Sequence, residues 1–210
     1  MKRCPTLEHE QALWAKGIRY VAGLDEAGRG AWAGPVVAAA VVLPPRPEVA
    51  CALRGVTDSK QLSAARRSAL RERIITVALT WGIGCASVDE IDARGIAAAT
   101  RLAMQRALHR LNPSPEALLI DAVALPEVAL PQHAFPFADA LSLSVAAASI
   151  LAKTERDGLM VALDSELPGY GFARHKGYGT RAHVEQLRAL GLSAHHRKSF
   201  RPVRALSLEA

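Results

Sequence analysis

The chain is organised around Tyr20-Val-Ala-Gly-Leu-Asp-Glu-Ala-Gly-Arg-Gly-Ala-Trp-Ala-Gly-Pro35. The residues Arg19–Leu24 form a short apolar run, which is typical of a buried strand. Asp25 and Glu26 follow, so the sequence predicts two adjacent carboxylates where that strand ends. The next apolar run, Val36–Leu43, predicts a second strand that pairs with the first as a hairpin.

Glycines follow the acidic pair. Gly28, Gly30 and Gly34 allow backbone conformations that other residues avoid and let the main chain approach a ligand closely. Arg29 adds a planar cationic group suited to phosphate. An ordinary charged turn would also place two acids before a hairpin loop, so the acidic pair alone does not decide between a site and a turn.

Two further acids are expected at the ends of elements. Asp121 ends a buried apolar run, and Asp139 opens a long alanine-rich helix. Asp139 has an alternative role as a helix N-cap, and Asp121 as a strand end in contact with water. The other expected elements are helices at Leu7–Trp14, Ala64–Ala78 with Ser63 as N-cap, Asp139 to about Leu163 and Thr180–Leu190, one or two helices within Asp89–Leu111, and strands at Trp81–Val88 and Ala117–Asp121.

This order of elements predicts an α/β protein whose mixed sheet begins antiparallel and finishes parallel. The sequence lacks the glycine patterns of dinucleotide-binding and P-loop proteins. Its 210 residues suffice for one large domain, and half of them are hydrophobic. No apolar stretch reaches the roughly 20 residues that span a bilayer, so we expect no membrane segment. Three widely spaced cysteines indicate neither disulfides nor a zinc site and fit a reducing cytoplasm.

The net charge of +6 favours an anionic partner, and the excess is concentrated near the C-terminus. The segment from Arg174 to Arg204 contains one acidic residue, Glu185, and eight basic ones: Arg174, Lys176, Arg181, Arg188, Arg197, Lys198, Arg201 and Arg204. Four of the seven histidines lie in the same segment. We predict a nucleic-acid-binding surface, with a merely solvated basic face as the alternative.

The glycine-rich string resembles the signature of the bacterial type 2 ribonucleases H, the ribonuclease HII family. That signature runs Gly-x-Asp-Glu-Ala-Gly-Arg-Gly followed by Gly-Pro. The matching residues are Gly23, Asp25, Glu26, Ala27, Gly28, Arg29, Gly30, Gly34 and Pro35. Further motifs follow in the expected order to about Val203. One departure is Phe137-Ala138, where many bacterial members have Lys-Gly.

The resemblance implies a ribonuclease H-like fold, with helices flanking the mixed sheet and a basic helical extension at the C-terminus. It divides the chain into an N-terminal extension at 1–18, a catalytic core at 19–165 and a substrate-binding segment at 166–210. It implies a metal-dependent endonuclease that cuts 5′ to a ribonucleotide in RNA/DNA hybrids and in DNA with embedded single ribonucleotides. The products would carry a 5′-phosphate and a 3′-hydroxyl.

The resemblance also assigns a four-carboxylate catalytic and metal-binding set, Asp25, Glu26, Asp121 and Asp139. Carboxylates this close repel one another unless a cation is present. Oxygen ligands of this kind suit Mg²⁺ or Mn²⁺, and two such ions would serve an in-line phosphodiester displacement.

Substrate recognition is assigned by the same resemblance. The backbone of Gly28-Arg29-Gly30 would contact the ribose 2′-hydroxyl, which distinguishes RNA from DNA. Tyr178 would stack on the sugar beyond the ribonucleotide. Further matching motifs are Asp58-Ser-Lys60, the run from Ala146 to Asp157, and His196-Arg-Lys-Ser-Phe200. Lys60, Lys153 and the cations of the tail would contact phosphates or equally serve the fold. Asp157 would pair with a neighbouring cation rather than bind metal.

Other functions remain open on the sequence. A non-catalytic nucleic-acid binder would have lost at least one of the four acids, and none is lost. Another two-metal nuclease of the same fold, such as a resolvase or integrase, would lack the glycine motif and Tyr178. A type 3 ribonuclease H would carry an additional N-terminal domain, for which the residues before the first strand are too few. We expect a cytoplasmic monomer.

Overall fold

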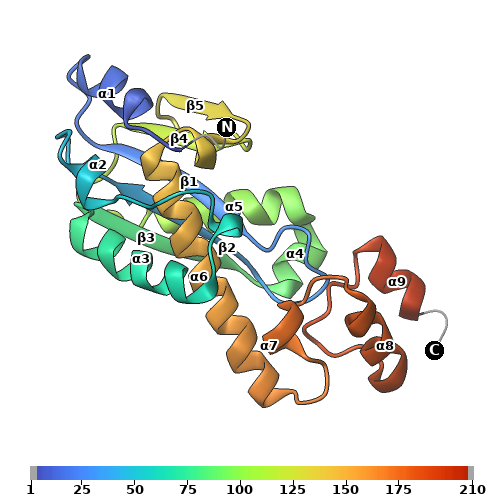
Figure 1. Ribbon diagram of the computed structural model, residues 1–210. Coiled ribbons are helices and arrows are strands. Elements are labelled where there is room, and N and C mark those ends of the chain that lie inside the picture. Colours follow the sequence, from blue (N-terminus) through green and yellow to red (C-terminus); the bar gives the residue numbers. More distant parts are fainter. Residues whose placement is uncertain (1–3, 208–210) are drawn as a thin grey trace.

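A five-stranded sheet runs through the protein in the order β3-β2-β1-β4-β5 (Figure 1). This computed structural model describes residues 4–207, so the ends of the two predicted terminal segments, 1–3 and 208–210, lie outside the described residues. The strands are β1 (Val21–Ala27), β2 (Val36–Val42), β3 (Thr80–Ala86), β4 (Ala117–Asp121) and β5 (Gln132–Phe135).

The sheet is mixed, as the sequence predicts. β1 pairs antiparallel with β2, and β2 with β3. β1 pairs in parallel with β4, and β4 with β5. The carboxyl ends of the three parallel strands therefore lie at one edge of the sheet, and the hairpin loop after β1 leaves from that same edge.

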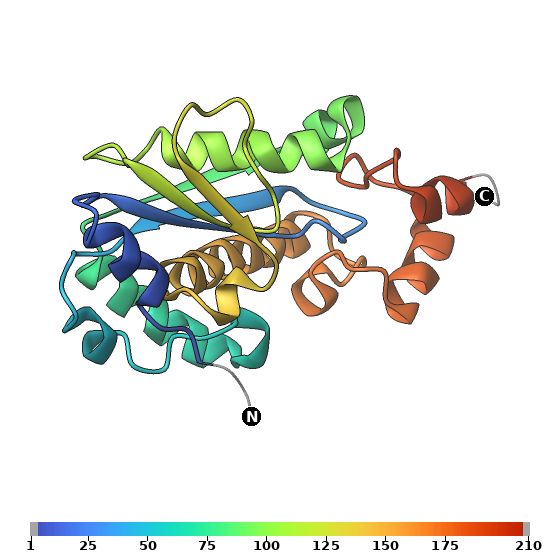
Figure 2. The same cartoon turned by 90° about the horizontal axis from the view of Figure 1, so that it is seen from above.

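Helices cover both faces of the sheet (Figure 2). One face packs against α5, and the other against α6, with α3 beside α6. The helices are α1 (Glu8–Trp14), α2 (Val49–Ala52), α3 (Ala64–Val77), α4 (Val88–Arg94), α5 (Ile96–Leu108), α6 (Leu143–Glu166), α7 (Phe172–His175), α8 (Arg181–Leu190) and α9 (Arg201–Ser207), with short 3₁₀ turns η1 (Ser59–Gln61) and η2 (Ala138–Ala140).

Small residues bring α6 close to the sheet. Every residue of β2 is buried, and so are Ala146, Ala147 and Ala148 of α6. A Cβ at Gly23 of β1 would lie 2.3 Å from the carbonyl carbon of Ser144, so only glycine permits this approach. The close packing holds β1 firmly against α6, and both elements carry residues of the candidate site.

Two helix starts follow their predicted chemistry. The Ser63 side chain accepts a hydrogen bond from the Arg66 N–H and caps α3, as expected. The long helix differs from its prediction, because Asp139 lies in η2 and Ser142 is the N-cap of α6. Asp139 is therefore placed before the helix, and its carboxylate is not used as a helix cap.

Two predictions about strands are corrected. The first strand was expected to end at Leu24, but β1 continues through Asp25 and Glu26, because these residues stay paired with Ala39 and Ala38 of β2. No strand is predicted after β4, yet the segment that follows it contains β5. That strand is short and partly exposed, with prolines on either side, so it lacks the alternation that marks a strand.

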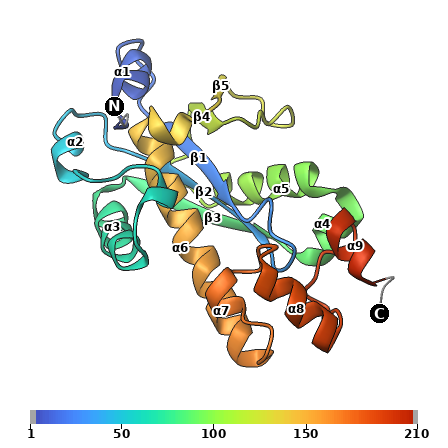
Figure 3. The ribbon, with the colours of Figure 1, turned by 45° about the vertical axis from the view of Figure 1, so that its right-hand side comes forward.

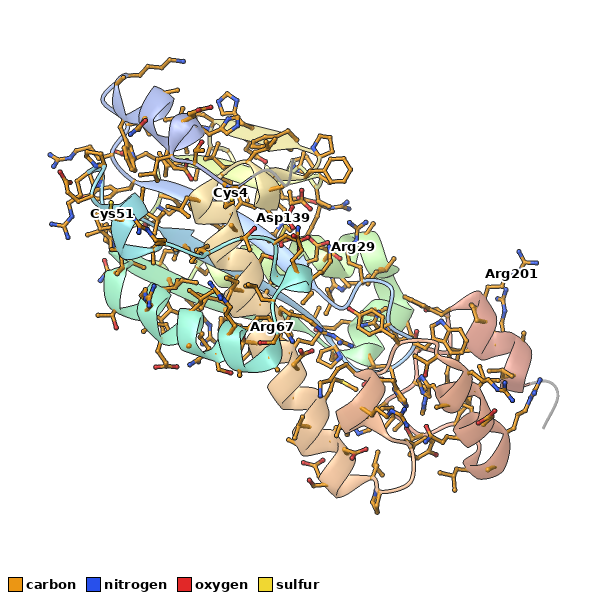
Figure 4. All side chains as sticks on the ribbon, in the orientation of Figure 1. Cys4, Arg29, Cys51, Arg67, Asp139 and Arg201 are labelled. Atoms are coloured by element: carbon orange, nitrogen blue, oxygen red, sulfur yellow. The ribbon has the colours of Figure 1, made fainter. Side chains whose placement is uncertain are left out.

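The C-terminal segment packs at one end of the sheet, where α7 lies beside the end of α6, and α9 lies on the side of α4 (Figure 3). Its interior holds three buried histidines, His175, His183 and His196, around the buried Phe172. The positive charge of this segment does not lie wholly on its surface, because these histidines and Arg197 face inward. Arg201 does project outward from α9 (Figure 4).

Neither a membrane-spanning helix nor a disulfide bond is found among residues 4–207. Within this range no helix is both long and apolar enough to cross a bilayer. The three cysteines, Cys4, Cys51 and Cys85, are free.

Candidate active site

Four carboxylates gather at the edge where the parallel strands end. Asp25 and Glu26 belong to the end of β1, and Asp121 is the last residue of β4. Leu24 pairs with Ile120 in the parallel register, so the residues that follow them, Asp25 and Asp121, come out side by side. The structure therefore brings together acids that lie almost a hundred positions apart in the sequence.

Asp25 is the most deeply enclosed acid of the site, with 6% of its surface exposed. Its Oδ1 accepts a hydrogen bond from the Glu26 N–H at 2.7 Å, and its carboxylate also accepts one from Ser149. Ser149 Oγ lies 3.0 Å from Ser59 Oγ, which fixes its position. Burial, and then the charge of Glu26, raise the pKa of Asp25 well above its usual value.

Glu26 points into the same region with one oxygen unpaired. Its Oε1 lies 3.4 Å from Nη1 of Arg29, while Oε2 is buried and finds no hydrogen-bond donor among the described residues. Burial raises the pKa of Glu26, and the nearby Arg29 opposes that shift. A buried carboxylate oxygen without a donor is costly, and a cation would satisfy it.

Asp121 holds the turn that carries the fourth acid. Its Oδ1 accepts a hydrogen bond of 2.8 Å from the Ala138 N–H, which fixes η2 against the end of β4. Asp139 is the next residue and is nearly buried, with 7% exposure. Burial, followed by the charges of Asp121 and Asp58, raises the pKa of Asp139.

One amine faces these acids from η1. Burial alone would lower the pKa of Lys60, but Asp139, Asp25, Asp58 and Asp121 together raise it. Lys60 therefore stays protonated beside the acids and offsets part of their charge. The backbone N–H of Lys60 donates to Oδ1 of Asp58 at 2.9 Å, which holds the turn that carries the amine.

The donor chemistry fits a divalent cation. Mutual repulsion, raised pKa values and the unpaired Oε2 of Glu26 all indicate negative charge that lacks a counterion. Within residues 4–207, no three His, Cys, Asp or Glu side chains are already arranged around one point as ligands. Cation binding would thus require side-chain rotations at the acid edge, the name we use for Asp25, Glu26, Asp121 and Asp139.

A cleft of about 680 Å³ opens next to the acid edge. Its walls come from the loop Gly28–Pro35, which we call the glycine loop, and from η1, α6 and the α7 region, and many of the lining side chains are cationic. The lining residues include Glu26, Gly28, Arg29, Gly30, Lys60, Arg67, Lys153, Arg174, Lys176 and Tyr178. A hollow of the same volume beside Trp81 and Leu159 contains none of the four acids.

Tyr178 is held in the cleft by cations. Its ring centroid lies 5.7 Å from Lys153 Nζ and 5.4 Å from Arg156 Cζ. Lys153 also pairs with Asp157 at 2.6 Å, and Arg67 pairs with the other oxygen of Asp157 at 3.1 Å. The prediction that Asp157 binds a neighbouring cation is confirmed.

The fold is the ribonuclease H-like fold, here with an acid-lined sheet edge beside a cationic cleft. The family model of ribonuclease HII matches residues 22–203. The chain belongs to the ribonuclease HII family, and it is an endoribonuclease of the ribonuclease H type.

Two curated relatives illustrate the similarity. Ribonuclease HII of Roseiflexus castenholzii is 54% identical over 203 residues, which cover 95% of this chain and 89% of the relative. Ribonuclease HII of Dehalococcoides mccartyi strain BAV1 is 48% identical over 208 residues, covering 97% and 95%.

Solved structures agree with the fold. Ribonuclease H2 of Pyrococcus horikoshii superposes with a TM-score of 0.73 at 26% identity, covering 90% of this chain and 97% of that one. Archaeoglobus fulgidus ribonuclease HII, solved in complex with PCNA, gives 0.74 at 28% identity, covering 89% and 96%. Bst ribonuclease HIII, solved in complex with Mn²⁺, gives 0.67 at 22% identity and covers 95% and 74%; it supports the fold alone.

The structure adds residues that the sequence did not single out as parts of the site. Ser59 and Ser149 support Asp25, and Asp58 positions Lys60. Arg156 and Arg197 lie behind the glycine loop, fully buried. All five residues fall inside motifs that resemble the family, but a motif does not report which groups its residues contact.

Proposed function

We propose that this enzyme hydrolyses the phosphodiester on the 5′ side of a ribonucleotide, in RNA/DNA hybrids and in DNA with embedded single ribonucleotides. The products are a 5′-phosphate and a 3′-hydroxyl. The observation that carries the proposal is the acid edge itself, whose buried and mutually repelling carboxylates adjoin a cleft lined by cations. Family membership supplies the reaction class.

The acid edge would hold two divalent cations, Mg²⁺ or Mn²⁺. When bound, such ions activate the attacking water and stabilise the departing 3′-oxygen. Asp25 and Glu26 would be ligands from β1, with Asp121 and Asp139 from β4 and η2. Support comes from the buried unpaired oxygen of Glu26 and from the raised pKa values, since each raised pKa marks a charge that a cation would relieve.

Substrate selection would fall to the loop and the tyrosine of the cleft. The backbone of Gly28-Arg29-Gly30 would contact the ribose 2′-hydroxyl, and Tyr178 would stack on the sugar beyond it. Lys60 and Lys153 would meet phosphate oxygens. Tyr178 lines the same cleft as the loop, so one strand passing through it would meet both.

The segment 166–210 would be the substrate-binding part of the protein, and 19–165 its catalytic core, with 1–18 as an extension. Exposed cations of the segment, such as Arg174, Arg181 and Arg201, would track the duplex. We expect a cytoplasmic monomer whose partner is the duplex. The archaeal relative was solved with PCNA, so a replication clamp is a candidate protein partner.

The test uses an end-labelled DNA duplex with one ribonucleotide, incubated with and without Mg²⁺, beside all-DNA and RNA/DNA hybrid duplexes. Metal-dependent cleavage on the 5′ side of the ribonucleotide is expected. Cleavage of the hybrid alone would contradict the assigned roles of Tyr178 and the glycine loop. Binding without cleavage would favour a non-catalytic nucleic-acid binder.

A further inference from the structure

Two arginines are buried behind the loop Gly28–Pro35. Arg156 comes from α6, and Arg197 from the segment between α8 and α9; both have 0% exposure. Neither takes part in an ion pair within residues 4–207. Buried cations are costly unless other groups solvate them, so their partners reveal what they do.

The partners of Arg197 are main-chain carbonyls of the loop. Nε and Nη2 donate to the carbonyl oxygen of Gly34 at 2.9 and 2.8 Å, and Nη2 also donates to that of Pro35 at 3.1 Å. Nη1 donates to the carbonyl oxygen of Arg29 at 3.0 Å. One guanidinium thus holds both ends of the loop.

Arg156 holds the same loop from α6. Its Nε donates to the carbonyl oxygen of Pro35 at 2.9 Å, and its Nη2 to that of Ala33 at 3.1 Å. Its Nη1 donates to the carbonyl oxygen of Lys176 at 3.0 Å. Arg156 therefore ties the glycine loop to the segment that carries Tyr178.

The contact with Arg29 fixes the direction of a donor. The peptide bond between Arg29 and Gly30 is trans. In a trans peptide the C=O and N–H groups point in opposite directions. Since the Arg29 carbonyl points inward to Arg197, the N–H of Gly30 points the other way, and Gly30 lines the cleft.

The backbone N–H groups in the part of the loop away from the cleft already donate hydrogen bonds within the protein. Trp32 and Ala33 donate to the carbonyl oxygen of Gly177, and Gly34 donates to that of His195. In contrast, the N–H groups of residues 28–30 have no acceptor among residues 4–207. The unused donors are therefore confined to the part of the loop that faces the cleft.

We propose that Arg197, supported by Arg156, is a positioning residue that turns the Gly30 N–H towards the 2′-oxygen of a bound ribonucleotide. The inference rests on the proposed function. Without the guanidinium, the carbonyls of Arg29 and Gly34 would lose their donors, and the peptide would rotate to find others. Arg197 thus acts on ribose recognition without touching the substrate.

The test measures binding to two duplexes that differ only by the 2′-hydroxyl of one nucleotide. An Asp25→Asn background prevents cleavage, and Mg²⁺ is present throughout. The Asp25→Asn protein should bind the ribonucleotide duplex more tightly than the DNA duplex. Adding Arg197→Lys keeps the charge but loses the fixed fork, and should reduce this preference about 5- to 10-fold, the size of one hydrogen bond. Affinity for the DNA duplex should stay the same.

The matched control is Arg106→Lys, because Arg106 also donates to a main-chain carbonyl, that of Cys85, but outside the cleft. It should leave the preference unchanged. If Arg197→Lys is poorly folded by circular dichroism, Arg156→Lys should reduce the preference instead. A full preference in the folded variant, or equal losses on both duplexes, would overturn the inference. Failure of the wild-type enzyme to cut at the ribonucleotide would instead refute the proposed function.

Discussion

The acid edge and the two buried arginines are both concentrations of charge, within the same part of the molecule, but they are treated differently. The charge of Arg197 is solvated by carbonyl oxygens, and although burial and the charge of Arg156 lower its pKa to about 9, it stays cationic at neutral pH. Asp25 and Glu26 have raised pKa values and few donors. The charge of the arginines is compensated within the fold and holds the glycine loop in place. The charge of the acids is not compensated and is therefore available to bind a ligand.

Asp25→Asn should give the largest effect on activity. The amide keeps the shape of the side chain but is a poor metal ligand, so turnover should be abolished, while duplex binding stays largely intact. Cleavage assays and fluorescence anisotropy on the same duplex separate the two. Asp164→Asn, on the far part of α6, is the control. Normal turnover in Asp25→Asn would remove Asp25 from the metal site.

Gly28→Ala should disturb the packing of the buried Arg156 against the glycine loop. Gly28 has φ +95, and a Cβ there would lie 2.0 Å from Nε of Arg156. We expect a loss of about 2–4 kcal/mol in the free energy of unfolding. At Gly30 a Cβ would meet nothing within 4 Å, so Gly30→Ala should leave stability nearly unchanged. Equal stability of the two variants in urea titrations would contradict this packing.

How much of this could be read from the sequence differs between the two regions. The acids were predictable because each one ends a recognisable apolar run or opens a motif. Arg197 was expected, with the other cations of the basic tail, either to contact phosphate or to serve the fold, and the structure buries it behind the glycine loop. Its partners, Arg29 and Gly34, lie more than 160 positions away, so no local pattern reports the contact.

The positions of β5 and Asp139 were mispredicted for the same reason, because contacts with other parts of the chain override the local preference of the sequence. β5 is four residues long between two prolines, and it is held by pairing with β4 rather than by its own propensity. Asp139 was expected to open a helix because Asp is a good N-cap. Ser142 takes that role, and the hydrogen bond from Ala138 to Asp121 holds Asp139 at the acid edge instead.

Tyr178→Ala should separate substrate recognition in the cleft from catalysis at the acid edge. Loss of stacking on the sugar should reduce cleavage at a single ribonucleotide about 10-fold, and less on an extended hybrid, where other contacts remain. Initial rates on both duplexes check this. Tyr170→Phe, which loses only the hydroxyl contact to the Gly191 carbonyl, is the control. Equal losses on both duplexes would exclude a junction role for Tyr178.

The acid edge should reveal itself in the pH dependence of stability. Because the folded-state pKa of Asp25 is raised, the native state holds protons more tightly, and its stability is lost as pH rises from about 4 through that pKa. Without metal, Asp25→Asn should therefore gain stability relative to wild type as the pH rises from 5 to 8. Mg²⁺ should reduce or reverse this advantage. Urea titrations at pH 5 and 8 measure it, and a constant difference would contradict the unsatisfied charge.

The smallest effect is expected at Phe137, which is 75% exposed and has φ 60 beside Asp121. A left-handed conformation costs a non-glycine residue about 1 kcal/mol. Phe137→Gly should therefore raise the free energy of unfolding by that amount, whereas Phe137→Ala, which keeps the strain, should not. Thermal unfolding of both variants decides. Equal stabilities would show that the turn carries no such strain.

The central claim is that the four acids form a binding site for two divalent cations. The Asp25→Asn variant lacks one of the proposed metal ligands. The crystals should therefore contain the wild-type enzyme with Mn²⁺ and a duplex whose scissile phosphate resists cleavage. The anomalous signal should show two peaks among Asp25, Glu26, Asp121 and Asp139, next to that phosphate. Ordered duplex with no Mn²⁺ peak at these carboxylates would contradict the claim.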